Sequence, residues 1–177
     1  EPEPEPEPQP QPEPQPQPEP EPEFDGILTI SQLNYSDDDN TTFHTGGPSY
    51  DNQYVSWGKP GQYQGYGFLR WSVNISSVLP NRNYDIKVHY YIASPVPSYM
   101  SGWMEFTVTV IINSSWRSSD GYATRQVWSW QKLPRVVGRW TSHTFTGGNF
   151  QRTHNTVQIQ QVFGPLSVAY LELIPTS

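Results

Sequence analysis

The side chains in this chain with the clearest chemical potential are aromatic rings, which include seven tryptophans among 177 residues. Trp128 and Trp130 are two residues apart, so they share one face of a predicted strand. Trp116 and Trp140 lie near predicted strand ends, where loops carry binding groups. Flat rings can stack on the apolar faces of sugars or anchor a protein interface. They also fill the cores of β-sandwiches, and the sequence leaves all three uses open.

Catalytic chemistry finds little support in the sequence. Beyond residue 23 there are two glutamates, Glu105 and Glu172, and the four histidines show no metal-ligand spacing. No thiol, nucleophile elbow or phosphate loop occurs. A carboxylate pair for glycoside cleavage would need Glu172 and a distant aspartate to meet in the fold. We therefore predict a protein that is not an enzyme and has no cofactor.

One acidic run could hold a metal ion. Asp37, Asp38 and Asp39 are consecutive, and hard oxygen ligands in a loop suit calcium. A solvated turn is the alternative reading of the same three residues. A structural calcium ion therefore remains a weak expectation.

Four Asn-x-Ser/Thr sequons occur, at Asn34, Asn40, Asn74 and Asn113. The alternation of the predicted strands puts Asn74 and Asn113 on polar faces, where a glycan would leave the core undisturbed. The sequence contains no hydrophobic run long enough for a membrane helix and begins at Glu1 instead of Met. We therefore expect a processed extracellular glycoprotein, secreted or on a cell surface, with no membrane span.

Residues 1–23 form an arm in which every even position is proline and every odd position is Glu or Gln. Proline fixes φ and keeps the preceding residue extended, so this arm is predicted to be polyproline II or strand. At about 3.1 Å per residue, it would reach about 70 Å. It is either a spacer between modules or an assembly arm. Its acidic residues are Glu1, Glu3, Glu5, Glu7, Glu13, Glu19, Glu21 and Glu23.

Charge separates the arm from residues 24–177. Of 17 acidic residues, eight lie in the arm, which leaves nine acids against ten bases in the remainder, a formal charge of +1. Such a small charge makes nucleic acid a poor partner. Five cations form a basic segment that could meet the arm of another copy, or could simply be solvated. They are Arg117, Arg125, Lys132, Arg135 and Arg139.

Residues 24–177 read as one all-β domain. Leu69, Trp71, Val73 and Ile75 alternate with polar residues, as expected for one buried strand face. Nine strands separated by Gly and Pro turns predict a jelly-roll β-sandwich without helices. The predicted strands are 27–35, 54–57, 67–75, 84–92, 105–112, 123–130, 139–146, 156–163 and 168–174.

Five short segments resemble the galactose-binding-like jelly roll, particularly carbohydrate-binding modules of families six and thirty-five. They are Tyr54-Val55-Ser56-Trp57, Asn83-Tyr84-Asp85-Ile86, Gly138-Arg139-Trp140, Asn155-Thr156-Val157 and Ala169-Tyr170-Leu171-Glu172-Leu173. The resemblance implies that a sugar is stacked between Tyr54 and Trp140. It also implies a structural calcium ion held by acids of the first and last strands, although Ala169 stands where an aspartate is expected.

Two functions follow from these observations. In the first, the chain is a structural subunit that assembles with copies of itself into a fibre, because its acidic arm packs on neighbouring molecules. In the second, the domain is a carbohydrate-binding module of a secreted polysaccharide-active enzyme, and the arm is a linker. The sequence favours the first function slightly, and glycans are possible partners in both.

Overall fold

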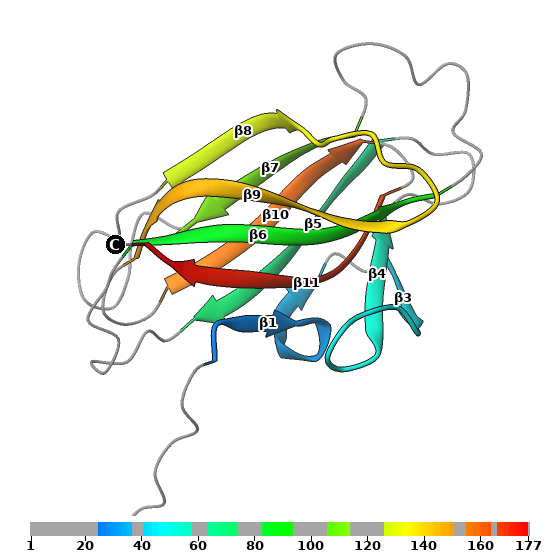
Figure 1. Cartoon of the computed structure of the whole chain (residues 1–177), viewed down its shortest axis with the longest axis horizontal. Helices are drawn as coiled ribbons and strands as arrows, with labels where there is room; N and C mark the ends of the chain where they lie inside the picture. The colour runs from blue at the N-terminus through cyan, green and yellow to red at the C-terminus, as the bar shows by residue number, and fades with distance from the viewer. Residues whose placement is uncertain are drawn as a thin grey trace, which may run out of the picture.

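The computed structural model consists of two antiparallel sheets packed face to face, with a short 3-10 helix as the one helical element in the part it describes (Figure 1). The described residues are 25–36, 41–57, 64–73, 83–93, 106–113, 126–150, 155–163 and 166–176. The jelly-roll sandwich predicted from the alternating segments is therefore confirmed. The predicted arm, residues 1–23, lies outside the described residues.

The first sheet has six strands. Its path runs β3–β4–β11–β6–β9, and β1 pairs with β11 on the same edge as β4. The strands are β1 (Ile27–Thr29), β3 (Thr41–Thr45), β4 (Gln53–Trp57), β6 (Asn83–Ile92), β9 (Trp140–Asn149) and β11 (Leu166–Pro175). The second sheet runs β2 (Leu33–Ser36), β5 (Gln64–Val73), β10 (Asn155–Phe163), β7 (Thr107–Ile112) and β8 (Gln126–Lys132).

The core lies between the two sheets and follows the predicted alternation. Leu69, Trp71 and Val73 of β5 are buried, as are all five alternating apolar residues of β6 from Tyr84 to Ile92. The indole nitrogen of Trp71 donates a hydrogen bond to the carbonyl of Thr29 at 2.7 Å. This bond satisfies the one polar atom of a fully buried ring, so the prediction that Trp71 belongs to the core is confirmed.

The prediction of one strand over 27–35 is wrong. The segment is split into β1, the 3-10 helix η1 (Ile30–Gln32) and β2, so it crosses from the first sheet to the second. The side chain of Gln32 accepts the backbone N–H of Thr29 at 2.8 Å, and Asp51 accepts that of Ser31 at 2.7 Å. These side-chain acceptors stabilise a turn that competes with the strand.

Two other strands differ from the prediction. β3 lies outside the nine predicted strands, but it forms the edge of the first sheet. β7 was expected to be half-buried, whereas all six of its residues are buried. Its second face adjoins Gln158 of β10, which is also buried and accepts a hydrogen bond from Arg70 at 3.0 Å. The second face of β7 therefore lies among buried polar side chains, such as Gln158, and not in solvent.

Candidate binding site

Four paired residues cross the outer face of the six-stranded sheet. Ser56 of β4 pairs with Ser167 of β11, Ser167 pairs with Tyr91 of β6, and Tyr91 pairs with Trp140 of β9. Paired residues of antiparallel strands project from the same face of the sheet. The row therefore has two small residues on one side and two large rings on the other, which leaves space above the serines.

Four rings surround this space. The rings of Tyr54 and Trp140 are in edge-to-face contact, with centroids 5.5 Å apart and planes at 77°. The ring of Tyr91 lies 5.5 Å from that of Trp140, and His44 stacks on Tyr54 at 4.6 Å. Nε2 of His44 is 2.7 Å from the hydroxyl of Ser56. The rings are thus held by one another and by the small residues beside them.

The space between these residues is a hollow of about 500 Å³, which we call the aromatic groove. Of the described residues that line it, none carries a carboxylate or an ammonium group. The lining offers flat apolar surfaces and neutral hydroxyl or imidazole groups, which suits ligands rich in hydroxyls. Its described residues are His44, Thr45, Gly47, Tyr54, Ser56, Tyr91, Ala93, Trp140 and Ser167.

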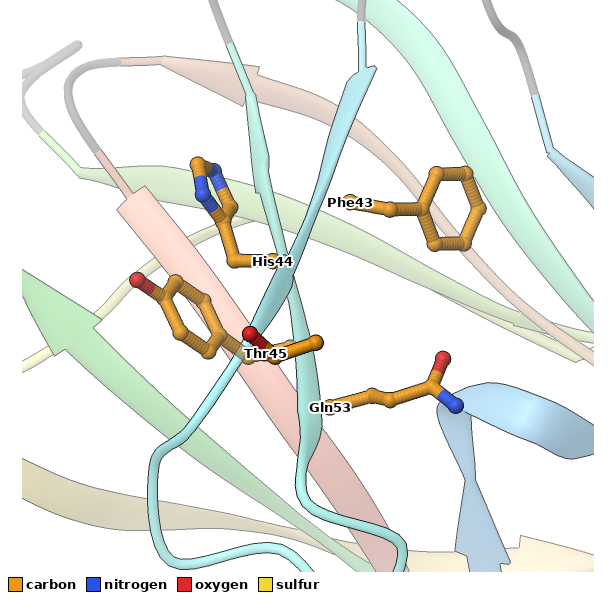
Figure 2. Close-up of a pocket in the computed structure, with 5 residues that line it drawn as sticks. Phe43, His44, Thr45 and Gln53 are labelled. Carbon is orange, nitrogen blue, oxygen red and sulfur yellow. The ribbon is translucent and has the colours of Figure 1, made fainter.

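A second hollow of about 430 Å³ adjoins the aromatic groove at the β3–β4 hairpin, and His44 and Tyr54 line both. Figure 2 shows that His44 projects to one side of the hairpin and Phe43 and Gln53 to the other. Phe43 is 48% exposed, an unusual position for a large apolar ring. The edge hairpin thus presents groups on both of its faces.

A glycine loop allows Tyr54 and Trp140 to approach each other. Gly47 has φ of +88°, and a Cβ there would lie 3.2 Å from the Trp140 ring and 3.3 Å from that of Tyr54. Any other residue would be strained in its backbone and crowded against both rings. Gly47 therefore forms part of the groove wall.

Asp51 fixes the end of this loop. It accepts hydrogen bonds from the Ser31 N–H at 2.7 Å, the Ser49 hydroxyl at 2.8 Å and the Gln53 N–H at 3.1 Å. Burial alone would raise the pKa of Asp51, but these hydrogen bonds favour the charged form and lower its pKa overall. The carboxylate therefore ties η1, the loop and β4 together beside the groove.

The segment before Trp140 is anchored to the end of β6. Gly138 donates its N–H to the carbonyl of Ile92 at 2.9 Å, and the Tyr90 hydroxyl donates to the carbonyl of Pro134 at 2.7 Å. Burial raises the pKa of Tyr90 to about 12, so this donor keeps its proton across the ordinary pH range. These bonds tie the segment that leads into Trp140 to β6, which lies far from it in the sequence, and so place Trp140 at the groove.

The next pairs of β6 and β11 on the same face, His89 with Tyr170 and Lys87 with Glu172, carry a second cluster, which we call the filled end. The rings of His89 and Tyr170 stack at 3.9 Å, and Tyr50 packs edge-on against Tyr170 at 5.2 Å. Lys87 lies 3.1 Å from Glu172. Nε2 of His89 is also 3.1 Å from a Glu172 oxygen, but without the alignment of a hydrogen bond.

Histidine 89 is held neutral near neutral pH. Burial lowers its pKa, the charge of Glu172 offsets this in part, and Lys87 adds to the lowering. The His89 ring that lies close to Glu172 is therefore uncharged, and the two do not form an ion pair. The one ion pair of the filled end is Lys87 with Glu172.

The structure places two of the five predicted sugar-binding residues, Tyr54 and Trp140, in the aromatic groove. The resemblance implied that a sugar is stacked between these two rings. In this conformation the rings touch each other, so a sugar does not fit between them. Trp128 packs against the core, near Phe145, and does not line the groove. Trp116 and the side chain of Trp130 lie outside the described residues.

Sequence reasoning missed His44 and Tyr91. Tyr91 had a signal, because the alternation of its strand already put this aromatic ring on the face opposite the core. His44 had no such signal, because its segment lies outside the predicted strands. Both residues reach the groove through strand pairing, which no local pattern reveals.

The structure describes two of the four sequon asparagines, Asn34 and Asn113. Asn34 is exposed and donates to the Ser72 hydroxyl at 2.8 Å, whereas Asn40 and Asn74 lie outside the described residues. The prediction that Asn113 lies on a polar strand face is wrong, because the residue is buried, and glycosylation there stays a prediction. Its φ of +54° breaks the strand alternation, and its buried amide bonds to Asn155 and to the N–H of Thr156.

Three residues of the predicted basic segment, Lys132, Arg135 and Arg139, are exposed. Arg117 and Arg125 lie outside the described residues, as do Asp37, Asp38 and Asp39. Among the residues that the structure does describe, no three His, Cys, Asp or Glu side chains are grouped to hold a metal. Ala169, at the expected aspartate position, is fully buried and supplies no oxygen from its side chain.

Within the described residues, no helix is long and apolar enough to cross a membrane. Asp85 and Glu172 project near each other on the sheet face, but neither lines the groove. Asp85 accepts the N–H of Gly147 at 2.9 Å, and Glu172 is paired with Lys87. The described carboxylates therefore form no open pair beside a hollow.

No protein-family model and no curated protein matches the sequence, but solved structures share its fold. A carbohydrate-binding module of lichenase 5A from Cellvibrio mixtus, in complex with cellotriose, aligns with a TM-score of 0.51 at 10% identity, covering 85% of this chain and 97% of that one. A family 35 carbohydrate-binding module from an environmental isolate aligns with 0.50 at 8% identity, with coverages of 85% and 97%.

A third match is the GH26-CBM35 β-(1,4)-mannanase of Podospora anserina, with a TM-score of 0.51 at 15% identity. The alignment covers 87% of this chain but 28% of that enzyme, so it involves a part of the larger protein. At these low identities the likeness shows a shared fold. The resemblance to the carbohydrate-binding modules of families six and thirty-five is thus confirmed at the level of the fold.

Proposed function

We propose that the aromatic groove binds carbohydrate and that the domain is a non-catalytic carbohydrate-binding module acting outside the cell. The observation that carries the proposal is the arrangement of Tyr54, Tyr91 and Trp140 around a hollow next to Ser56 and Ser167. Ring faces pack on the apolar faces of a pyranose, while hydroxyl and imidazole groups pair with its hydroxyls. The fold shared with known sugar-binding modules supports the proposal.

The neutral lining favours a non-catalytic role. Glycoside cleavage needs two carboxyl groups on either side of the scissile bond, and none of the described lining residues is acidic. The described carboxylates Asp25, Asp51, Asp85 and Glu172 are all engaged with other groups of the chain. The groove is thus equipped to hold a sugar and not to hydrolyse it.

The experiment is a glycan-binding screen of the full chain, followed by calorimetric titration with each hit. The panel includes cellotriose and β-(1,4)-linked manno-oligosaccharides, because proteins of similar fold are described with these sugars. Trp140→Ala should weaken binding by at least tenfold, or about 1.4 kcal/mol. Tyr50→Ala, which removes a ring that is 69% exposed at the filled end, is the matched control and should bind like the natural chain.

A fibre-forming subunit was the other function predicted from the sequence. It depends on the arm, which lies outside the described residues. The aromatic groove offers one specific feature in its favour, a surface whose chemistry suits a proline-rich peptide.

A further inference from the structure

We propose that the aromatic groove also binds the Glu/Gln-Pro arm, residues 1–23, of a second copy of this chain. The occupant is thus a peptide segment and not a sugar, and the proposal stands apart from glycan binding.

The groove has the surface that proline-rich peptides recognise. Such peptides dock as preformed polyproline II helices against grooves lined by aromatic rings. Here Tyr54 and Trp140 meet at 77° and Tyr91 flanks Trp140, so the rings form ridges beside a hollow of about 500 Å³. Gly47 lets the rings of Tyr54 and Trp140 lie close together, because a side chain there would meet both of them.

The arm presents the same short motif at every register. Each of its eleven prolines, at positions 2 to 22, is preceded by Glu or Gln. A polyproline II helix has three residues per turn, so proline and Glu or Gln alternate along each edge at about 9 Å. Many overlapping segments of one arm can therefore fill the groove equally well, which raises the apparent affinity of a weak contact.

The charges of the two partners are complementary. The arm carries eight glutamates, and no described residue of the groove lining is acidic. Arg135 and Arg139 are exposed on the segment that leads into Trp140, and the Gly138–Ile92 hydrogen bond holds this segment against the end of β6. Ile92 directly precedes Ala93, a lining residue. A docked arm would thus place carboxylates near these guanidinium groups.

The polarity of β1 indicates that the docked arm comes from another molecule. Ile27 pairs with Glu172 and Thr29 with Tyr170, so β1 runs toward the groove end of β11, where Ser167 lies. The chain therefore enters at the opposite end, near Leu173, about 20 Å from the groove. An arm stiffened by alternating prolines would have to reverse its direction to reach its own groove, whereas a neighbour's groove lies within its reach.

This contact joins two different surfaces of the same chain. A head-to-tail contact of that kind forms a ring if the rotation closes and a filament if it does not. In the predicted self-assembly, the aromatic groove of one copy is therefore the surface that receives the arm of the next.

The test is sedimentation velocity of the full chain over a wide range of protein concentrations. The natural chain should form larger species as concentration rises, and Trp140→Ala should shift that onset to at least tenfold higher concentration. Ser167→Phe, which fills the hollow, should do the same if the Trp140 variant folds poorly. Tyr50→Ala should assemble like the natural chain, and excess synthetic peptide of residues 1–23 should dissolve the assemblies.

Three results would overturn the proposal: a chain that stays monomeric throughout, assembly that ignores both groove variants, or arm docking that does not depend on concentration and is therefore intramolecular. Glycan titrations run at concentrations where the chain is monomeric keep the two proposals separate. A sugar can then bind while the arm does not, or the reverse, and a sugar that binds should also compete with assembly.

Discussion

The groove end and the filled end are neighbouring parts of the outer face of the six-stranded sheet, and they contain similar residues but differ in what occupies them. Each has a histidine stacked on a tyrosine, His44 on Tyr54 at 4.6 Å and His89 on Tyr170 at 3.9 Å. At the filled end the stack is covered, and Tyr170 is 8% exposed. At the groove end a hollow of about 500 Å³ remains.

The difference arises from the small residues and not from the aromatic ones. Ser56, Ser167 and Ala93 line the groove, whereas Lys87 and Glu172 occupy the face beside His89. An aromatic cluster on a sheet face is therefore a binding surface only where its neighbours leave room. The same rings closed over by larger neighbours serve stability, and this contrast can be tested from both ends.

Filling the groove should have the largest effect. Ser167→Phe places a ring in the hollow, so the groove end would resemble the filled end, and glycan binding should fall below detection in a calorimetric titration. Thermal melts show whether the variant folds, since Ser167 is 7% exposed and the new ring must extend from a covered position into the hollow.

Thr144→Phe is the matched control for this variant. Thr144 is exposed on the same sheet, on β9, and pairs with Lys87, away from the groove. Undiminished binding by Ser167→Phe would show that the hollow is not the binding site.

Emptying the filled end should affect stability instead. Tyr170→Ala removes a ring that packs on His89 and Tyr50, and truncation of a buried aromatic ring of this kind costs about 3 kcal/mol. For a domain of this size, that corresponds to a drop of roughly 6–12 °C in melting temperature. Calorimetry should show this drop while the glycan affinity stays within about twofold of the natural value. A loss of affinity equal to that of Trp140→Ala would mean that the two ends act as one site.

A smaller change concerns the wall of the groove. Gly47→Ala introduces a Cβ at φ of +88°, about 3.2 Å from Trp140 and 3.3 Å from Tyr54. We expect about 1 kcal/mol of backbone strain and a severalfold weaker glycan affinity, because the rings must shift. Gly138→Ala is a suitable control, since its φ is +78° but nothing lies within 4 Å of its Cβ position. It should lose similar stability and no affinity, as titration and thermal melts can show.

The sequence predicted the core faces and two residues of the groove, but not how the groove is formed. Alternation correctly identified the core faces around Trp71 and Val88, because burial of one strand face is a local pattern. The resemblance identified Tyr54 and Trp140 as a pair, and they do meet. It could not show that their rings touch, since that depends on the absent side chain of Gly47.

Other features depend on contacts between distant segments. Asn113 followed the polar parity of its strand, but a positive φ turned its side chain inward to Asn155. The strand predicted over 27–35 was interrupted because Asp51, far along the chain, accepts the N–H of Ser31. Neither event has a signal in the local sequence, so the crossing between sheets and the buried sequon were out of reach.

The smallest expected effect is a pH dependence at the filled end. Burial lowers the pKa of His89 below 6.5 despite Glu172, so the unfolded chain takes up a proton before the folded one does. Its contribution to stability is complete above pH 6.5 and is lost as pH falls from there toward the lowered pKa. His143, whose pKa burial also lowers, acts in the same direction.

Thermal melts between about pH 7.5 and pH 5 should therefore show a falling melting temperature, with a shallower fall in His89→Gln. Glycan affinity of this variant should match the natural chain at pH 7.5 or so, since His89 does not line the groove. An unchanged slope in the variant would indicate that His89 is not held neutral in the folded state.

The central claim, that the aromatic groove is where a ligand binds, is tested most directly by nuclear magnetic resonance of the indole N–H groups in the full chain. The signals of Trp140 and Trp71 are assigned with Trp→Phe variants, and a glycan identified in the screen is then titrated. The account predicts that the Trp140 signal shifts with saturation, whereas Trp71, fully buried and bonded to the Thr29 carbonyl at 2.7 Å, does not move. A bound glycan that leaves the Trp140 signal in place would contradict the account.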